Sequence, residues 1–128
     1  MFRGVIIEES LESKDVLNLF PILQTEVEQV TERFGTPWLT EWHLHTIEVP
    51  DTQIAEFAKA VQLAIESAHQ TSWYADFKTD TVHYIIFKNK IFVIDRTKRE
   101  EYQAAQDYGI SLGVPPHQVN FTTNVVNV

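Results

Sequence analysis

The sequence contains no cysteine and only four glycines. Without cysteine, the chain has neither a disulfide framework nor a thiolate metal site. The glycines form no phosphate-cradling or dinucleotide-binding pattern, and we expect no serine in a nucleophile elbow. These absences remove several common classes of enzymatic site. They leave open whether the protein is an enzyme, and they identify no cofactor.

Long apolar runs are also absent. The N-terminal apolar stretch, residues 5–7, is too short for a signal peptide, and no run approaches the length of a membrane span. Hydrophobic residues make up 44% of the 128 residues and aromatic residues 12%, which is typical of a globular protein. We therefore expect a soluble cytoplasmic protein with one domain, residues 1–128, in which residues 110–128 can form an extended tail.

Basic residues are few, ten against eighteen acidic ones, and the net charge is −8. The excess lies in residues 1–66, which hold twelve acids and four bases. A negative field of this kind repels phosphate backbones, so we expect no nucleic-acid partner. The basic residues between Lys88 and Arg99 are interrupted by Asp95 and followed by Glu100 and Glu101, which indicates a solvated hairpin end and helix start, with an anion site as the alternative.

The hydrophobic pattern predicts an α+β fold. Strands are expected at residues 2–8, 38–49, 73–78 and 83–95, the last of these a hairpin. Asp51 is expected to cap a long helix with an apolar stripe from Ile54 to Ala68, and a capping box at Thr97 and Glu100 predicts a shorter helix ending at Gly109. A further short helix is expected between Ser13 and Pro21. The order resembles a ferredoxin-like antiparallel sheet with an added hairpin.

Residues 23–34 are ambiguous, because Leu23, Val27, Val30 and Phe34 fit helical spacing while the β-branched residues favour a strand. We predict a strand, since Thr36 and the proline after it then allow a hairpin-like return.

The hairpin at residues 83–95 is apolar on both faces. A turn at Asn89-Lys90 would pair Phe87 with Phe92 and Tyr84 with Asp95. One face then carries His83, Ile85, Phe87, Phe92 and Ile94, and the other carries Tyr84, Ile86, Ile91 and Val93. Antiparallel sheets commonly leave one face in water, so two apolar faces require two covers. The long helix supplies one, and we expect a second subunit to supply the other, with a ligand or the C-terminal segment as alternatives.

The segment EWHLHT, residues 41–46, is the sharpest candidate for chemistry. On a strand, Glu41, His43 and His45 point to one side, where two imidazoles and a carboxylate could share a metal ion. Asp76, His83 or Asp95 could complete the shell. Half-buried strands also use histidine freely, so solvent-facing or hydrogen-bonded histidines are the alternative.

Two further groups could contribute a site. Tyr84, His83, Asp76 and Asp95 could perform acid/base chemistry, although a tyrosine bonded to a carboxylate is also a common structural solution. Trp42, Trp73 and Tyr84 are candidate ligand-binding residues that could line an aromatic pocket, and filling the core is their alternative role.

Several sequence blocks, carried in a fixed order, resemble those of a family of short bacterial proteins of unknown function. The blocks are VIIEES, TPWLTEWHLHTIEVP, WYADFK, HYIIFKNKIFVIDR and YGISLGVPPHQVNF. This resemblance covers nearly the whole chain and implies a single-domain protein of the bacterial cytoplasm. It implies no catalytic residues.

These observations favour a non-enzymatic module that binds a protein partner or forms a homodimer. Two alternatives stay open. One is a small metal-dependent hydrolase that uses Glu41, His43 and His45, and the other is a small-molecule sensor with an aromatic pocket.

Overall fold

The computed structural model describes residues 1–69 and 73–126, and within these residues it shows a six-stranded sheet with two α-helices. The strands are β1 (Phe2–Ile7), β2 (Ile22–Gln29), β3 (Glu41–Val49), β4 (Tyr74–Lys78), β5 (Val82–Phe87) and β6 (Ile91–Asp95). The helices are α1 (Ile54–Ala64) and α2 (Arg99–Leu112). The α+β class is therefore confirmed.

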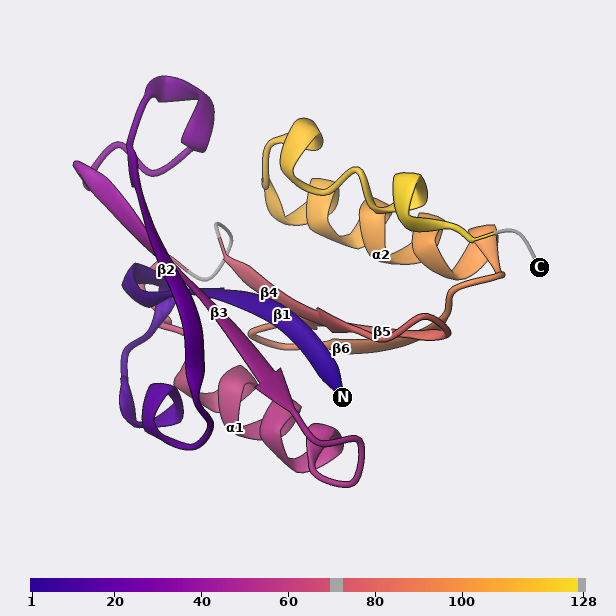
Figure 1. The fold of residues 1–128 in the computed structure, drawn as a ribbon. Helices are drawn as coiled ribbons and strands as arrows, with labels where there is room; N and C mark the ends of the chain where they lie inside the picture. Colours follow the sequence, from indigo (N-terminus) through magenta and orange to yellow (C-terminus); the bar gives the residue numbers. More distant parts are fainter. Residues whose placement is uncertain (70–72, 127–128) are drawn as a thin grey trace.

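The sheet is antiparallel throughout, in the order β2-β3-β1-β4-β5-β6 (Figure 1). β3 and β4 flank β1 and run parallel to each other, so α1 crosses over β1 to connect them. A ferredoxin-like core places its helices on one side of the sheet, whereas here α1 and α2 lie on opposite sides (Figure 1). The ferredoxin-like arrangement is not confirmed.

The strand predicted within residues 23–34 is present as β2, which lies at one edge of the sheet. All eight of its residues are exposed, and its pairing with β3 shifts register between Ile22 and Gln24. The bulge and the charges of Glu26 and Glu28 are features that discourage an open edge from recruiting another strand.

The hairpin of β5 and β6 has the predicted faces but a different turn. Phe87 and Lys90 exchange two backbone hydrogen bonds of 2.8 and 3.4 Å, so the loop is Lys88-Asn89 and Tyr84 pairs with Val93. The predicted pairings of Phe87 with Phe92 and of Tyr84 with Asp95 are therefore wrong. Among the described residues only glycines adopt positive φ, so the expected left-handed turn does not form. The register changes by two residues, which leaves each side chain on its predicted face.

Both faces of this hairpin pack against other parts of the chain, although Val93 on the α1 side remains 56% exposed. On one face Ile86 is buried in the core that α1 forms with Ile47 and Phe77. The other face is covered by α2 and the C-terminal segment, and its buried residues are Ile85, Phe87, Ile94, Tyr102, Ala105, Val114, Val119 and Phe121. The expectation that a second subunit supplies this cover is therefore wrong, because the tail adds the large apolar side chains that α2 lacks. A homodimer stays a prediction, but the hairpin no longer requires a second subunit to cover this face.

The C-terminal segment packs closely against α2, so residues 110–126 do not form the extended tail that the sequence allowed. Its 3-10 turns span Pro116–Gln118 and Phe121–Asn124. A Cβ atom on Gly109 would lie 2.8 Å from Val119 Cγ1, so glycine at this helix position lets the tail approach. Residues 127–128 of the predicted tail lie outside the described part.

The predicted helix starts and stops are partly wrong. The Asp51 carboxylate binds the Met1 ammonium at 2.7 Å and does not cap α1, which begins after Gln53. The Thr97 hydroxyl donates to the Asp95 carboxylate at 2.8 Å, so the predicted capping box is absent. α2 continues past Gly109 and ends before Gly113, whose φ is 96°.

Two other helix boundaries also differ from expectation. α1 ends at Ala64, before the predicted end of its stripe at Ala68. The short helix expected after Ser13 is a 3-10 turn, Asp15–Asn18. Within the described residues, neither α-helix is long and apolar enough to cross a membrane.

Candidate functional site

An open groove lies on the face of the sheet that α2 only partly covers. α2 and the tail pack on β5 and β6, whereas β1, β3 and β4 contribute most of the groove lining. A larger polar compartment of about 850 Å³ adjoins a smaller, mostly apolar one of about 260 Å³. Val5 and Asp76 line both compartments, so the two meet at these residues.

Aromatic side chains wall the apolar compartment. Its lining consists of Val5, Ile7, Trp42, Leu44, Trp73, Tyr74, Asp76 and Gln118. The ring centroids of Trp42 and Trp73 are 5.6 Å apart. Each indole N–H is held by a hydrogen bond, that of Trp42 to the Thr36 hydroxyl at 3.0 Å and that of Trp73 to the Glu66 carboxylate at 3.1 Å. The wall is therefore rigid before any ligand arrives.

Of the three predicted aromatic residues, the structure brings two together. Trp42 and Trp73 both line the apolar compartment, but they are only 8% and 1% exposed and also fill the core, which was their alternative role. Tyr84 lies on the opposite face of the sheet, where its ring packs edge-to-face on Phe2 with centroids 5.4 Å apart. Sequence reasoning missed Tyr74, whose hydroxyl donates to the Gln118 carbonyl and whose pKa is raised by burial and by the nearby Asp76 carboxylate.

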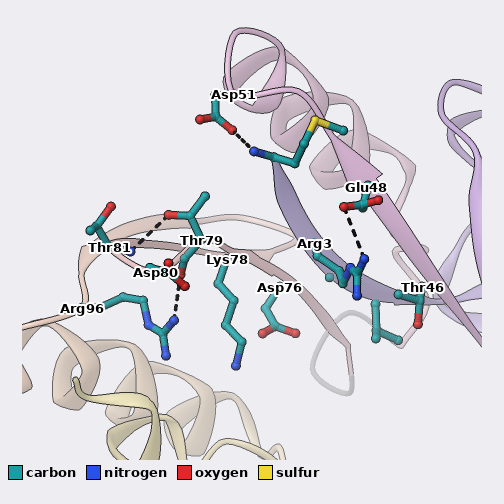
Figure 2. Close-up of a pocket in the computed structure, with 13 residues that line it drawn as sticks. Arg3, Thr46, Glu48, Asp51, Asp76, Lys78, Thr79, Asp80, Thr81 and Arg96 are labelled. Carbon is teal, nitrogen blue, oxygen red and sulfur yellow. Dashed lines mark hydrogen bonds and ion pairs between the residues drawn. The ribbon is translucent and has the colours of Figure 1, made fainter.

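Charged residues of both signs line the polar compartment (Figure 2). Arg3 pairs with Glu48 at 3.4 Å, and the Lys78 ammonium donates to the Asn124 amide oxygen at 3.0 Å. Figure 2 shows the Asp76 and Lys78 side chains projecting from β4 on the same side of the sheet. Among the described residues, no lysine or arginine nitrogen lies within 4.0 Å of the Asp76 carboxylate.

A buried chain of hydrogen bonds begins at Asp76. Its Oδ2 lies 2.7 Å from Nε2 of His83, a residue with no exposed surface. The other ring nitrogen, Nδ1, lies 2.8 Å from the Tyr102 hydroxyl, to which Arg96 Nε donates at 3.2 Å. The Arg96 guanidinium also donates to the backbone oxygens of Thr79 at 2.7 Å and of Asn124 at 3.0 Å. The chain links the groove to α2 and the tail.

One tautomer of His83 fits both of its hydrogen-bond partners. The Tyr102 oxygen accepts from Arg96, and burial raises the Tyr102 pKa, so the phenol keeps its proton. That proton is donated to His83 Nδ1, which leaves Nε2–H to donate to the Asp76 carboxylate. This tautomer gives each ring nitrogen of His83 a partner and holds the Asp76 carboxylate in one orientation.

The predicted metal residues lie on one face of β3 but bind different carboxylates. His43 Nδ1 lies 2.6 Å from Glu9 Oε2, and its Nε2 is 3.8 Å from Glu41 Oε1. His45 uses both ring nitrogens, with Thr25 Oγ1 at 2.8 Å and Glu8 Oε1 at 2.9 Å. The donor atoms within 4.8 Å of one another belong instead to Glu8, Glu9 and His43. A metal site at Glu41, His43 and His45 stays a prediction.

The pairing of His43 with Glu9 predicts a pH dependence. The hydrogen bond to Glu9 raises the His43 pKa above its usual value of about 6.5, since it favours the imidazolium. The stabilisation is therefore full below about pH 6.5 and is lost as the pH rises through the folded pKa. We expect Glu9→Gln to lower the His43 pKa, which NMR titration measures. The variant should be less stable than the wild type at low pH, and this difference in the free energy of unfolding should become smaller as the pH rises.

Glu41→Gln is the matched control, because the Glu41 oxygen lies 3.8 Å from the imidazole and contributes less to the His43 pKa. A larger fall in the His43 pKa in Glu41→Gln than in Glu9→Gln would contradict the assignment.

One sequence pattern needs a correction. Residues 109–113, GISLG, match the spacing of the GxSxG nucleophile motif, contrary to the expectation that no serine is so placed. The motif requires a sharp turn from a strand into a helix, whereas these residues form the last turn of α2 and its cap. The Ser111 hydroxyl donates to the Tyr108 carbonyl at 2.6 Å. The pattern is therefore not a nucleophile elbow.

The predicted acid/base group is divided between the two faces of the sheet. Asp76 and His83 are in contact, as described above, but Tyr84 points to the α1 side and Asp95 binds Thr97 at the start of α2. Sequence reasoning missed Tyr102 and Arg96. Their roles depend on how α2 and the tail dock on the sheet, and the local sequence carries no signal for this.

Comparisons with protein-family models, with curated proteins and with solved structures find no match for the chain.

Proposed function

We propose that the protein is a non-catalytic module that binds a small amphipathic molecule in the groove. The observation that carries this proposal is the junction at Val5 and Asp76, where a rigid aromatic compartment meets a charged one. Ligand sites are mostly apolar concavities with a few fixed polar groups, and this groove has that composition. It corresponds to the aromatic-pocket alternative, in which Trp42 and Trp73 line the compartment that holds the ligand.

The position of His83 favours binding over catalysis. A general base must reach the proton that it removes, but His83 is fully buried behind Asp76 and has no free ring nitrogen. The imidazole therefore orients a carboxylate and does not itself face a ligand.

The test uses 2-phenylethanol, a neutral compound with one aromatic ring and one polar group. We expect it to shift the amide NMR signals of Ile7, Leu44 and Tyr74 with a dissociation constant that is roughly millimolar, as is usual for a ligand of this size. Val5→Phe should abolish the shifts, because the larger ring fills the junction of the two compartments.

Val93→Phe is the matched control, since the same substitution is made on the opposite face, where Val93 is 56% exposed. It should bind 2-phenylethanol as the wild type does. The proposal fails if the wild type shows no shifts at the groove, or if both variants lose binding equally while their spectra remain those of folded proteins.

A further inference from the structure

We propose that the natural ligand of the groove carries a protonated amine attached to an aromatic or apolar body, and that Asp76 binds the amine. This inference rests on the proposed function and specifies its ligand class. It follows from four features of Asp76: its position between the compartments, its unused oxygen, the lack of a lysine or arginine partner among the described residues and the charge of the protein around it.

Asp76 lies at the position where the apolar part of such a ligand would meet its charged group. The residue lines both compartments, and Tyr74, two positions earlier on β4, belongs to the aromatic wall. A ring placed against Trp42 and Trp73 therefore has the Asp76 carboxylate at the open end of its compartment. The charged group of the ligand would then lie in the polar compartment, where water can solvate the rest of it.

The Asp76 carboxylate has capacity for another donor. Its Oδ2 accepts from His83, whereas no hydrogen bond to Oδ1 is made within the described residues. The side chain remains 33% exposed. An ammonium group supplies the donors that this oxygen can accept, and a hydrogen bond between two charged groups is stronger than one between neutral groups.

Apart from Asp80 and Lys78, the other charged groups of the polar compartment are held by charged partners or by several hydrogen bonds. Arg3 and Glu48 form a pair, and the Met1 ammonium and Asp51 form another. Arg96 is fixed by two backbone oxygens and Tyr102. Among the described residues Asp76 has only His83 as its hydrogen-bond partner, and no lysine or arginine nitrogen lies within 4.0 Å of its carboxylate. The net charge of −8 further favours the approach of a cation.

The buried chain makes Asp76 a preorganised anchor. Because His83, Tyr102 and Arg96 hold the carboxylate in place, a ligand does not have to bear the cost of ordering it. His83 has no exposed surface and cannot contact the ligand, so it is a positioning residue.

Lys78 is the competing anchor. It lies two residues from Asp76 on the same side of β4, and its ammonium is bonded to the neutral amide of Asn124. If Lys78 were the anchor, the groove would prefer a carboxylate. The two possibilities differ in the sign of the ligand charge and can be separated directly.

The experiment compares three compounds that share a phenyl ring and a short linker: phenethylamine, 2-phenylethanol and 3-phenylpropionate. Dissociation constants are measured by NMR titration of the wild-type protein at neutral pH and low salt. We expect phenethylamine to bind about tenfold more tightly than 2-phenylethanol, because hydrogen bonds to charged groups add this much. 3-Phenylpropionate should bind most weakly, and added salt should reduce the advantage of the amine.

Asp76→Asn then removes the charge while its amide oxygen can still accept from His83 Nε2–H. We expect phenethylamine to lose its tenfold advantage in this variant, with the affinity for 2-phenylethanol unchanged. Asp80→Asn is the control, since Asp80 lines the polar compartment but not the aromatic one, and it should keep the preference for the amine.

The outcomes separate the two proposals. Equal binding of all three compounds would support the groove as a site and overturn the amine inference. If 3-phenylpropionate bound most tightly and lost this advantage in Lys78→Gln, the amine inference would be overturned and Lys78 would be the anchor. No binding of any compound would overturn the proposed function itself. The wild-type comparison decides the ligand charge even if Asp76→Asn does not fold.

Discussion

Replacing Gly4 with alanine should destabilise the protein by about 3 kcal/mol or more, an unusually large effect for one added methyl group. A Cβ atom at this position would lie 1.8 Å from the Asp76 carbonyl oxygen and 2.7 Å from Phe77 Cα. These are backbone atoms of β4, which pairs with β1 at this point. The clash therefore cannot be relieved by a side-chain rotation, and the two strands must separate. Urea denaturation measures the change.

Arg3→Ala is the control on the same strand. The Arg3 side chain is 63% exposed and forms only a surface ion pair with Glu48, so its loss should change the free energy of unfolding by no more than about 0.5 kcal/mol. A cost below about 1 kcal/mol for Gly4→Ala would show that β1 and β4 are further apart than described. Because the clash falls on Asp76, a folded Gly4→Ala protein should also bind phenethylamine less tightly than the wild type.

The sequence predicts the strands and faces well because these depend on local patterns. The alternation of residues 83–94 identifies both faces of the hairpin, and a turn error of one residue per strand leaves them unchanged. The caps were predicted less well, since Asp51 and Thr97 found other partners, the Met1 ammonium and the Asp95 carboxylate. A capping residue competes with every other charged group nearby, and its sequence position does not show which one is closer.

The site was predictable only in part. The tryptophans of the groove stand out by their residue type, and Asp76 with His83 was among the candidate acid/base residues. The series of hydrogen bonds that gives His83 its role also requires Tyr102 and Arg96. These two residues come close to His83 only after α2 and the tail have docked on the sheet. The residues that pack on the second apolar face of the hairpin were equally hard to predict. They include Val119 and Phe121, which are far from the hairpin in sequence.

Replacing Phe57 with alanine should cost about 3 to 5 kcal/mol, the range for truncating a buried phenylalanine. Phe57 is 3% exposed on the inner side of α1. Its ring packs edge-to-face on Phe77 of β4 and on Phe20, with centroids 5.5 and 5.1 Å away. Truncation therefore leaves a cavity between the helix, the sheet and the segment before β2, which three separate elements would have to close. Chemical denaturation with a constant m-value would measure the loss.

Leu63 provides the matched control on the same helix. It is as apolar as a core residue but 76% exposed, so Leu63→Ala should change the free energy of unfolding by no more than about 0.5 kcal/mol. Each substitution changes the helix propensity by no more than about 0.7 kcal/mol, because leucine and phenylalanine are ordinary helix residues and alanine is the best helix former. The difference between their costs therefore isolates burial. Equal costs would mean that the helix packs through another face. Phe77 follows Asp76 on β4. The affinity of a folded Phe57→Ala protein for phenethylamine would therefore also show whether packing on the α1 side supports the groove on the other side of the sheet.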